Sequence, residues 1–519
     1  MMGRASAALT ILLLAASAAC RDLGPIARGE ERQEVKDVSQ PLTAEVRLGQ
    51  AVGAVNRLVL GNNVQWVDRG DGLLTADGTQ FDRQMLALVE ELGPTVLRYP
   101  GGVLADTFEW RSGSGPISAR GTSERFEPRQ RQPVLFGTAE FLALCKDLHA
   151  EPFLTVNVAT GSPRDAADWL RAVNGPAGGV AAGPVHYWEI GNEPYLKEQA
   201  RPEVAVEPAT FASRANAFIR AMREADDTIA IGIPLRRDRM GAMSAVAFPG
   251  FAETVLGAVE ERFDFISLHD AYLPFIAGPA EAVARESPDD VFRASMAAYQ
   301  VVEDDLNQVR QMVSRRYPER RLPFAISEYN AIYTLHGALD GYIASLGGAL
   351  YIADLLRVMA ARDDILLANF WSLTGNWYFG AVSAQRQLRP AYHVLKAYSE
   401  ILRGQRLEVD VRSPTFDAPA IGAVPASRGV PTVAAFATSY AGRASLLLIN
   451  KSVTSRVVVT IQGASPPVRV ARELTDARLF DGSHEAGGLR WRDVTVETGT
   501  PLRVPVSAHS LLWLELTPR

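Results

Sequence analysis

The sequence predicts a (β/α)₈ barrel followed by a smaller all-β sandwich domain. From residue 57 to residue 398, eight short β-rich runs alternate with longer segments of helical periodicity, and this repetition favours a closed parallel barrel. Over residues 399–519, β-rich runs are separated by Gly, Pro, Asp and Ser turns without a helical stretch, which is typical of a sandwich. An open doubly wound sheet is the competing fold, but residues 61–66 lack the Gly-rich dinucleotide fingerprint that such sheets often carry.

Each element is read from its periodicity and its flanking turns. The predicted barrel strands are 58–60, 95–99, 153–157, 185–190, 229–233, 263–268, 324–327 and 366–371. The clearest helical segments between them are 81–92, 136–149, 209–225, 288–317 and 338–361. The predicted strands of the sandwich are 432–437, 445–449, 456–461, 494–496 and 510–516. Residues 41–56 have no helix of their own, so they can add one more strand to the sandwich.

The N-terminal 20 residues predict a signal peptide. Arg4 precedes an apolar run that is too short to span a bilayer, which needs about 20 residues. The small residues before Cys20 suit a lipoprotein signal peptidase, so we expect a lipidated Cys20, with ordinary cleavage and release as the alternative. Residues 21–40 are polar and predict a flexible tether. We therefore expect an exported protein, anchored in the periplasm or at the cell surface, or otherwise secreted.

Composition narrows the class of protein. The chain has 519 residues, of which 47% are hydrophobic and 22% charged, as in ordinary globular proteins. A net charge of −6 gives no reason to expect nucleic acid as a partner, and a membrane is expected only through the lipid on Cys20. Cys145 lies in an apolar run and reads as a core residue, so neither a disulfide framework, a metal site nor a cofactor is implied. The oligomeric state stays open.

Polar residues follow the predicted barrel strands. In such barrels the chemistry sits at the carboxyl ends of the strands. The residues at or just beyond these ends are Arg98, Asn157, Asn192, Glu193, His269, Tyr272, Glu328 and Trp371. Two of them are glutamates, and they follow the fourth and the seventh strand.

The two glutamates predict glycoside hydrolysis. This reaction needs two carboxyl groups facing each other across the scissile bond, about 5–5.5 Å apart in retaining enzymes. Strands four and seven lie roughly opposite each other in an eight-stranded barrel, so Glu193 and Glu328 can form such a pair. The structural alternatives are a helix-capping loop carboxylate for Glu193 and a surface carboxylate for Glu328. Glu189 points the same way as Glu193 but lies deeper, and we interpret it as a structural acid paired with Arg98.

The motif at 187–195, Tyr-Trp-Glu-Ile-Gly-Asn-Glu-Pro-Tyr, resembles the Asn-Glu-Pro acid/base motif of the large barrel clan of retaining glycosidases. Within that clan, the blocks at 97–102, 266–269 and 326–330 are similar to those of the α-L-arabinofuranosidases. The resemblance covers the chain from about residue 42 to its end, because those enzymes also carry a β-sandwich built from both chain ends.

The resemblance implies a role for each matching residue. Glu193 would be the general acid/base and Glu328 the nucleophile of a double displacement. Asn192 would bind the hydroxyl next to the anomeric carbon, and His269 or Tyr272 would orient Glu328 or contact the sugar. The sequence departs from the arabinofuranosidase pattern in three places, which puts the sugar in doubt: Val103, Pro194 and Tyr329.

The remaining candidates each have a binding and a structural interpretation. Asn157 can bind sugar hydroxyls or satisfy loop backbone, and His269 can instead be a core histidine. Trp371 can stack on a sugar face. We expect the Arg98 cation to keep Glu328 ionised, while an apolar wall and the charge of Glu328 raise the pKa of Glu193.

Several functions remain compatible with these residues. An endo-glucanase or xylanase, a β-xylosidase and a β-glucuronidase would use the same two glutamates. The arginines of residues 111–133 either favour a carboxylated sugar or form a solvated charge run. A hypothesis of another class is a non-catalytic, glycan-binding surface lipoprotein, because a fold alone does not establish catalysis.

Overall fold

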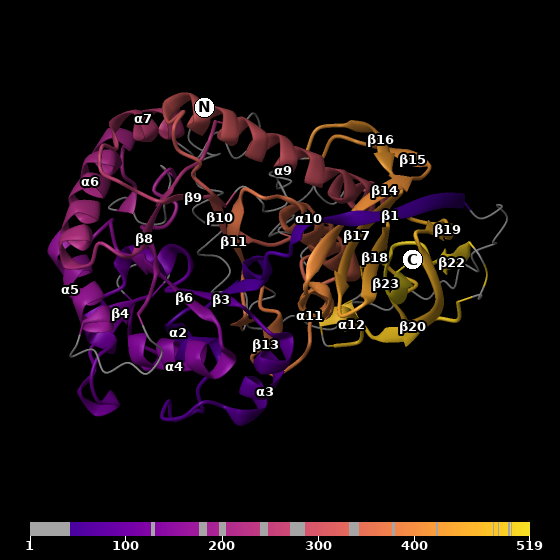
Figure 1. Ribbon diagram of the computed structural model, residues 1–519. Coiled ribbons are helices and arrows are strands. Elements are labelled where there is room, and N and C mark those ends of the chain that lie inside the picture. The colour runs from indigo at the N-terminus through magenta and orange to yellow at the C-terminus, as the bar shows by residue number, and fades with distance from the viewer. Residues whose placement is uncertain are drawn as a thin grey trace.

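The structure is a computed structural model of the 519-residue chain (Figure 1). It describes residues 42–125, 130–175, 184–196, 204–238, 248–269, 286–331, 342–375, 379–421, 424–480, 482–485, 487–496, 499 and 501–518. The predicted signal peptide, the tether and Cys20 lie outside these ranges. Among the described helices, none is long and apolar enough to cross a membrane.

Eight parallel strands close into a barrel, which confirms the predicted fold. In chain order they are β2 (Gly61–Asn63), β3 (Val96–Tyr99), β6 (Glu151–Val156), β7 (Tyr187–Ile190), β8 (Ala230–Pro234), β9 (Phe265–Ser267), β10 (Phe324–Tyr329) and β11 (Ile365–Phe370). Strand β11 pairs with β2 and completes the circle. Strands β7 and β10, the fourth and the seventh, are separated by two strands on one side and four on the other.

The first predicted strand is wrong in position. Residues Arg57–Leu60 form the 3₁₀ turn η2, and the barrel strand begins only at Gly61. The side chain of Asn56 accepts a hydrogen bond from the Leu58 N–H and thereby starts the turn. The apolar residues of the turn, Val59 and Leu60, are buried in the main core, so their hydrophobicity reports burial and not a strand.

Helices surround the barrel, and the short turns and hairpins lie in its loops (Figure 1). The main helices are α3 (Arg83–Leu92), α4 (Thr138–Leu148), α5 (Pro163–Asn174), α6 (Pro208–Ala225), α7 (Phe251–Ala258), α9 (Pro288–Arg316), α10 (Leu346–Ala361) and α11 (Pro390–Ile401). The shorter elements are α2 (Val67–Asp71), η3 (Gly102–Thr107), η4 (Trp110–Gly113), η5 (Ile117–Ala119), β4 (Thr122–Glu124), β5 (Arg131–Pro133), β12 (Thr374–Gly375) and β13 (Val382–Ser383). Side-chain caps at Asp82, Ser162, Ser287 and Ser345 begin four of the main helices.

The second domain is a nine-stranded sheet that folds over on itself. Its order is β21 (Trp491–Asp493), β20 (Ala464–Leu474), β23 (Ser510–Pro518), β18 (Arg443–Asn450), β17 (Val433–Tyr440), β14 (Gln405–Arg412), β1 (Leu42–Ala54), β19 (Val457–Gln462) and β22 (Leu502–Val506). Apolar side chains of strands that are not neighbours, such as Leu446 and Val459, share one buried core. The hairpin β15 (Thr415–Ala418) and β16 (Ser427–Pro431) and the short helix α12 (Gly482–Glu485) are further elements of this part.

The N-terminal strand β1 lies inside this sheet. It pairs antiparallel with β14 and parallel with β19. The predicted strand at 494–496 instead follows β21 as irregular chain. Helix α11 runs through residue 398, so the boundary expected there falls inside a helix.

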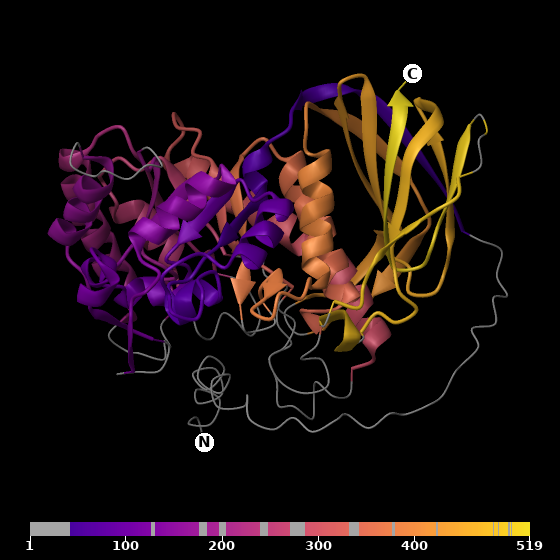
Figure 2. The same ribbon diagram turned by 90° about the horizontal axis from the view of Figure 1, so that it is seen from below.

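Helices α10 and α11 lie between the barrel and the all-β domain (Figure 2). Lys451, which follows β18, forms an ion pair with Asp354 of α10, and both side chains are 1% exposed. Arg357 contacts the same carboxylate, at 2.6 Å. A buried charge cluster of this kind fixes how the two domains are joined, because neither partner can leave without stranding a charge.

The barrel interior is built in layers. The lower layer is apolar and contains Val96, Phe153, Phe265, Ala325 and Leu367 from five strands. Two residues further along each strand, the side chains point the same way and form a second layer. That second layer is polar and fully buried: Asn63, Arg98, Thr155, Glu189, Ser267, Ser327 and Asn369. The site described below is built on this polar layer.

Gly232 of β8 makes room for the lower layer. A Cβ atom at this position would lie 2.0 Å from Cε2 of Phe265 on the neighbouring strand. We expect Gly232→Ala to lower the free energy of unfolding by about 1–3 kcal/mol, because the ring has to move in a packed core. Gly257→Ala is the matched control: nothing lies within 4 Å of its Cβ position, and in helix α7 alanine should stabilise by about 0.5–1 kcal/mol. Urea unfolding measures both, and equal effects would contradict the packing argument.

Candidate active site

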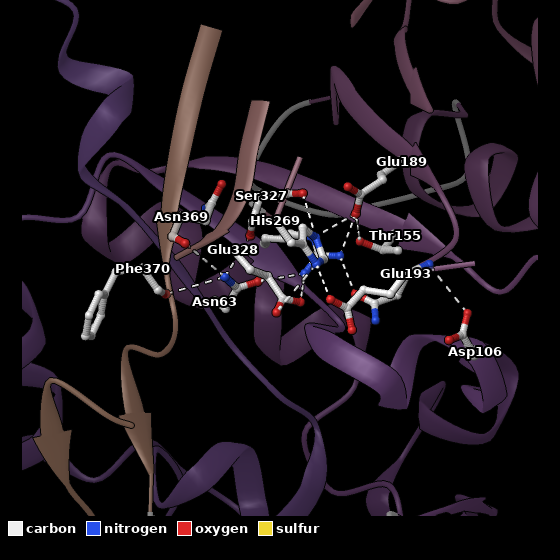
Figure 3. A network of polar contacts seen from close by, with 12 residues as sticks. Asn63, Asp106, Thr155, Glu189, Glu193, His269, Ser327, Glu328, Asn369 and Phe370 are labelled. Atoms are coloured by element: carbon white, nitrogen blue, oxygen red, sulfur yellow. Dashed lines mark hydrogen bonds and ion pairs between the residues drawn. The ribbon is translucent and has the colours of Figure 1, made fainter. Parts of the chain in front are cut away.

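The Arg98 guanidinium is the centre of a polar network at the barrel mouth. Its partners Asn63, Glu189 and Glu328 are labelled in Figure 3. Arg98 is fully buried and comes from the end of β3. Its Nη1 donates to Glu328 Oε1 at 2.8 Å, and its Nε donates to Glu189 Oε2 at 2.7 Å. Amide oxygens of Asn63 and Asn192 accept from Nη1 and Nη2 at 3.0 and 2.9 Å. One cation therefore joins side chains from three other segments of the chain: β2, β7 with the turn after it, and β10.

Glu328 reaches this cation through an irregularity in its strand. Ser327 belongs to the inward-facing polar layer, so strict alternation would turn the next side chain outward. The pairing of β10 with β11 shifts register between Ile326 and Tyr329. This shift lets two consecutive side chains face the interior. Glu328 is consequently 5% exposed and bound to Arg98, although it stands out of phase with the strand.

Glu193 lies just beyond the end of β7 on a turn in left-handed backbone. Its φ is 43°, and that of Gly191 is 84°. A Cβ at Gly191 would lie 2.2 Å from Val158 Cγ1, so glycine is required there. Tyr195 donates from its hydroxyl to Glu193 Oε1 at 3.2 Å. The carboxylate is partly accessible, with 21% of the side chain exposed.

His269 lies between the two glutamates. Its Nδ1 is 3.0 Å from Glu193 Oε1 and 3.8 Å from Glu328 Oε2. Its Nε2 is 2.9 Å from the Ser327 hydroxyl oxygen, which fixes the ring plane. Burial lowers the pKa of His269, but the charges of Glu328 and Glu193 raise it by more. Both predicted glutamates therefore face one imidazole in the same small space.

The pKa of Glu193 is shifted in the direction opposite to our expectation. Burial raises it, but the hydrogen bond and charge of His269 lower it by more, and Arg236 and Tyr195 add to that. The sequence could not predict this, because the imidazole comes from a strand more than 70 residues away. The pKa of His269 is raised and that of Glu193 is lowered, and both shifts favour a proton on His269 over one on Glu193.

Glu189 lies in the polar layer below the two glutamates. Its side chain is fully buried and accepts a 2.9 Å hydrogen bond from Thr155 in addition to its contact with Arg98. Burial raises its pKa, but Arg98 and His269 lower it by more, so the net pKa lies below the usual range. The interpretation of Glu189 as a buried acid paired with Arg98 matches these contacts.

Asn192 is held by contacts on two sides. Its side-chain oxygen accepts from Arg98, and its backbone N–H donates to Asp106 Oδ1 at 3.4 Å. Burial and, less strongly, the charge of Glu193 raise the pKa of Asp106 well above its usual range. Among the described residues, no partner contacts the buried Asn192 Nδ2.

The other predicted residues lie at different places. Asn157 makes hydrogen bonds with Thr160, Gly161 and the carbonyl of Phe108, so it stabilises its own loop and does not join the network. Trp371 is half-buried and packs on the paired glycines 101 and 102, where a Cβ atom would lie 2.7 or 2.6 Å from its ring. Tyr272 lies outside the described residues.

The arginines of the 111–133 loop form ion pairs with nearby carboxylates. Arg120 binds Glu140 at 2.7 Å, Arg131 binds Glu109 at 2.6 Å, and Arg125 approaches Asp68 at 3.3 Å. These pairs account for the three arginines without a carboxylated sugar, and Arg129 of the same loop lies outside the described residues.

Sequence reasoning missed four residues that shape the site. Asn63 donates to the backbone carbonyls of Ser327 and Asn369 and so ties β2 to β10 and β11. Ser327, Asp106 and Tyr195 contact His269, Asn192 and Glu193 as described above. Tyr195 lay within the recognised motif. In the sequence, the only signal for Asn63 is that it belongs to a pair of polar residues just after the first apolar run. That apolar run, and not the polar pair, is predicted as the strand.

No metal or cofactor is implied by these residues. Within the described ranges, no group of three or more His, Cys, Asp or Glu residues could hold a metal ion. Cys145 is buried in the core, as its apolar surroundings predicted.

Comparison with known proteins supports the resemblance seen in the motifs. A sequence profile described as "Alpha-L-arabinofuranosidase 1 domain" matches residues 88–244. The chain is 29% identical over 246 residues to an intracellular exo-α-(1→5)-L-arabinofuranosidase of Streptomyces lividans, an alignment that covers 43% of this chain and 36% of that protein. It is 22% identical over 494 residues to an intracellular exo-α-L-arabinofuranosidase of Bacteroides ovatus, which covers 87% of this chain and 89% of that protein. The resemblance to α-L-arabinofuranosidases is thereby confirmed.

The fold has a solved counterpart. The α-L-arabinofuranosidase from Thermotoga maritima, solved in complex with arabinose, matches with a TM-score of 0.76 at 20% identity. The match covers 91% of this chain and 99% of that one, so barrel and all-β domain are both included. At 20% identity, this similarity supports the fold alone.

The same comparisons correct the expected location. Both relatives are named as intracellular enzymes, which contradicts the prediction of an exported, membrane-anchored or secreted protein. That prediction rested only on the composition of residues 1–20, and a short apolar run after a single arginine is a weak signal. Export and lipidation of Cys20 are therefore withdrawn.

Arg98 can be tested by removing its charge. Arg98→Met should lower the free energy of unfolding by about 3–5 kcal/mol at neutral pH, because Glu189 and Glu328 stay buried without their cation. Without Arg98, burial raises the pKa of Glu189. A carboxyl whose pKa is raised in the folded protein contributes stability at low pH, and this contribution is lost as pH rises. The difference from wild type should therefore shrink when thermal unfolding is measured at pH 5 instead of pH 8. A pH-independent difference would contradict the charge argument.

Proposed function

We propose that this chain is a retaining glycoside hydrolase that acts by double displacement, with an α-L-arabinofuranoside as the best candidate for its substrate. The observation that carries the proposal is the contact of one His269 nitrogen with both Glu193 and Glu328. Two carboxylates that face each other at the mouth of a (β/α)₈ barrel are the machinery that this reaction needs.

The spacing of the carboxylates supports retention. The two distances from His269 Nδ1 set an upper limit on the gap between the nearest oxygens of Glu193 and Glu328. That limit lies at the short end of the range of about 6.5–9.5 Å found in inverting enzymes, and it leaves room for the 5–5.5 Å of retaining ones. An inverting enzyme would also need space for a water molecule between the carboxylate and the sugar.

The two glutamates differ in their partners, and this supports different roles. Arg98 holds Glu328 in place through a buried contact of 2.8 Å, which suits attack on the anomeric carbon. Glu193 is the more accessible carboxylate and contacts two groups that can hold a proton, His269 and Tyr195. When the leaving oxygen approaches, the proton of the His269–Glu193 pair passes through Glu193 to that oxygen. In the second step, Glu193 activates the water that releases the sugar.

Two further residues are suited to hold the sugar. Asn192 directly precedes Glu193 in the chain, and its Nδ2, which has no partner among the described residues, can donate to the hydroxyl beside the anomeric carbon. Trp371 presents a half-exposed ring over glycines 101 and 102, at the end of the eighth strand. Stacking on an aromatic ring is a common way to bind the apolar face of a sugar.

The arabinofuranoside assignment rests on the names of the matching profile and relatives. The chain spans only 36% of the length of the Streptomyces relative. Val103, Pro194 and Tyr329 depart from the arabinofuranosidase pattern. A xylosidase, glucanase or glucuronidase would use the same two carboxylates.

The roles of the two glutamates make different kinetic predictions. Glu193→Ala should lower kcat by about 10²–10⁴-fold on glycosides with a poor leaving group, and much less on nitrophenyl glycosides, which leave without a proton. Glu328→Ala should abolish turnover of both, by more than about 10³-fold, because no glycosyl-enzyme can form. Steady-state kinetics with the two leaving groups checks this. Wild-type rates in either variant would sink the assignment.

The substrate class is tested with a panel of chromogenic arabinofuranosides, xylosides, glucosides and glucuronides. We expect the highest kcat/KM on the α-L-arabinofuranoside, and a first product with the anomeric configuration of the substrate. Proton NMR of the first product checks the configuration. A product of opposite configuration would remove the nucleophile role of Glu328, and binding without turnover across the panel would favour a glycan-binding protein instead.

A further inference from the structure

A third carboxylate, Glu189, contacts Nε and Nη2 of Arg98, whereas Glu328 contacts Nη1, and the proposed reaction does not use Glu189. Figure 3 shows the two carboxylates. Glu189 is fully buried in the polar layer, whereas Glu193 and Glu328 lie nearer the mouth. No substrate can contact a side chain at this depth. Its effect on the reaction must therefore pass through Arg98.

The donors of Arg98 are divided between two carboxylates and two amides. A guanidinium has five N–H groups in one plane. Nε donates to Glu189 and Nη2 lies 2.6 Å from the same oxygen, while Nη2 also donates to Asn192. Nη1 donates to Glu328 and to Asn63. The shortest contacts of the cation are those with Glu189, so Glu328 shares it with a stronger competitor.

This sharing matters because the site is buried. A lone guanidinium and carboxylate at 2.8 Å in a medium of low dielectric constant attract each other strongly. A nucleophile held in that way is well oriented, but its negative charge is largely neutralised before it can attack. A second carboxylate on the same cation leaves the trio with a net negative charge. Part of that charge remains on the oxygens of Glu328.

We propose that Glu189 is a positioning residue for Glu328: it takes up part of the charge of Arg98, so that the guanidinium orients the nucleophile without neutralising it. The inference deepens the proposed function and rests on it for the role of Glu328. The trio is assembled from β3, β7 and β10, so its geometry is set by the barrel and not by a loop.

The surroundings of Glu189 are suited to this task. Thr155 of β6 donates to the same oxygen that contacts Arg98, which restricts the movement of the carboxylate. The charge of Glu189 raises the pKa of Asp106, so this carboxyl also faces it. The groups that lower the pKa of Glu189 are Arg98 and His269, and Ser267 of β9 adds a hydroxyl. Together they hold the pKa of Glu189 below its usual range against the effect of burial, so the group stays charged at the pH where Glu328 has to react.

The first test uses Glu189→Gln, which keeps the shape and removes the charge. Arg98 then has Glu328 as its only carboxylate among the contacts described above. We expect the acidic limb of the kcat/KM profile to move to lower pH by roughly one unit, and kcat on nitrophenyl glycosides to fall roughly tenfold with KM little changed. A purely structural role would lower activity at every pH and leave the limb in place, and that result would overturn the proposal.

Two variants serve as controls for the charge. Thr155→Val removes one hydrogen bond from Glu189 but keeps the carboxylate, so the acidic limb should stay near its wild-type position. Glu189→Asp keeps the charge at a shorter reach, and it should restore the limb even where kcat remains low. A limb that moves equally in all three variants would show that packing, and not charge, is responsible.

The second test does not depend on activity. A double-mutant cycle compares the fall in Tm caused by Glu328→Gln in the wild-type background and in the Glu189→Gln background. In the wild-type background, Arg98 keeps Glu189 as a partner when Glu328 is replaced, so the fall in Tm should be small. In Glu189→Gln, the same change leaves a buried guanidinium without any carboxylate, and the fall should be several times larger. Equal falls in the two backgrounds would overturn the proposal.

The two tests separate the two ideas. If the wild-type protein hydrolyses no member of the glycoside panel, the proposed function fails, and the cycle still reports whether the cation is shared. If the protein is active and Glu328→Gln lowers Tm equally in both backgrounds, the two carboxylates do not share Arg98 as proposed. The proposed function then still stands.

Discussion

The buried guanidinium of Arg98 is the interaction on which the rest of the site depends. A full positive charge inside a barrel is costly to desolvate, and it is tolerated only because carboxylates and amides surround it. Those partners come from β2, β7 and β10, and they hold the strand ends at fixed distances. Removing water from this layer therefore does two things at once. It fixes the geometry of the mouth, and it strengthens every charge interaction there.

The layered interior explains how a stable barrel and a reactive site can share the same strands. The lower apolar layer supplies packing, and the next inward-facing residues supply the polar network. The two carboxylates that we propose to react depart from the regular geometry. Glu328 faces inward only because its strand shifts register, and Glu193 lies on a left-handed turn beyond its strand. The regular strands position the site, and local irregularities of the backbone orient the two side chains.

Much of this could be predicted from the sequence, because repeated alternation of strand and helix patterns leaves few folds and the motif at 187–195 is specific. The prediction failed where tertiary contacts decide. Residues 57–60 are apolar enough for a strand, but Asn56 caps them into a turn. The pKa of Glu193 was predicted from burial and from Glu328, yet His269 lies nearer and reverses the shift. Asn157 follows a strand as the binding residues do, but its own loop uses both ends of its amide.

The position of β1 has a consequence for how the chain folds. This strand is made first, yet its two neighbours in the sheet, β14 and β19, are made only after the whole barrel sequence. Until then its backbone hydrogen-bonding groups have no partners in the sheet. The all-β domain therefore cannot complete itself during synthesis, and it depends on a closed barrel to bring its first strand back to the last ones. Fragment 399–519 alone would have a gap between β14 and β19, where a strand from another chain could pair.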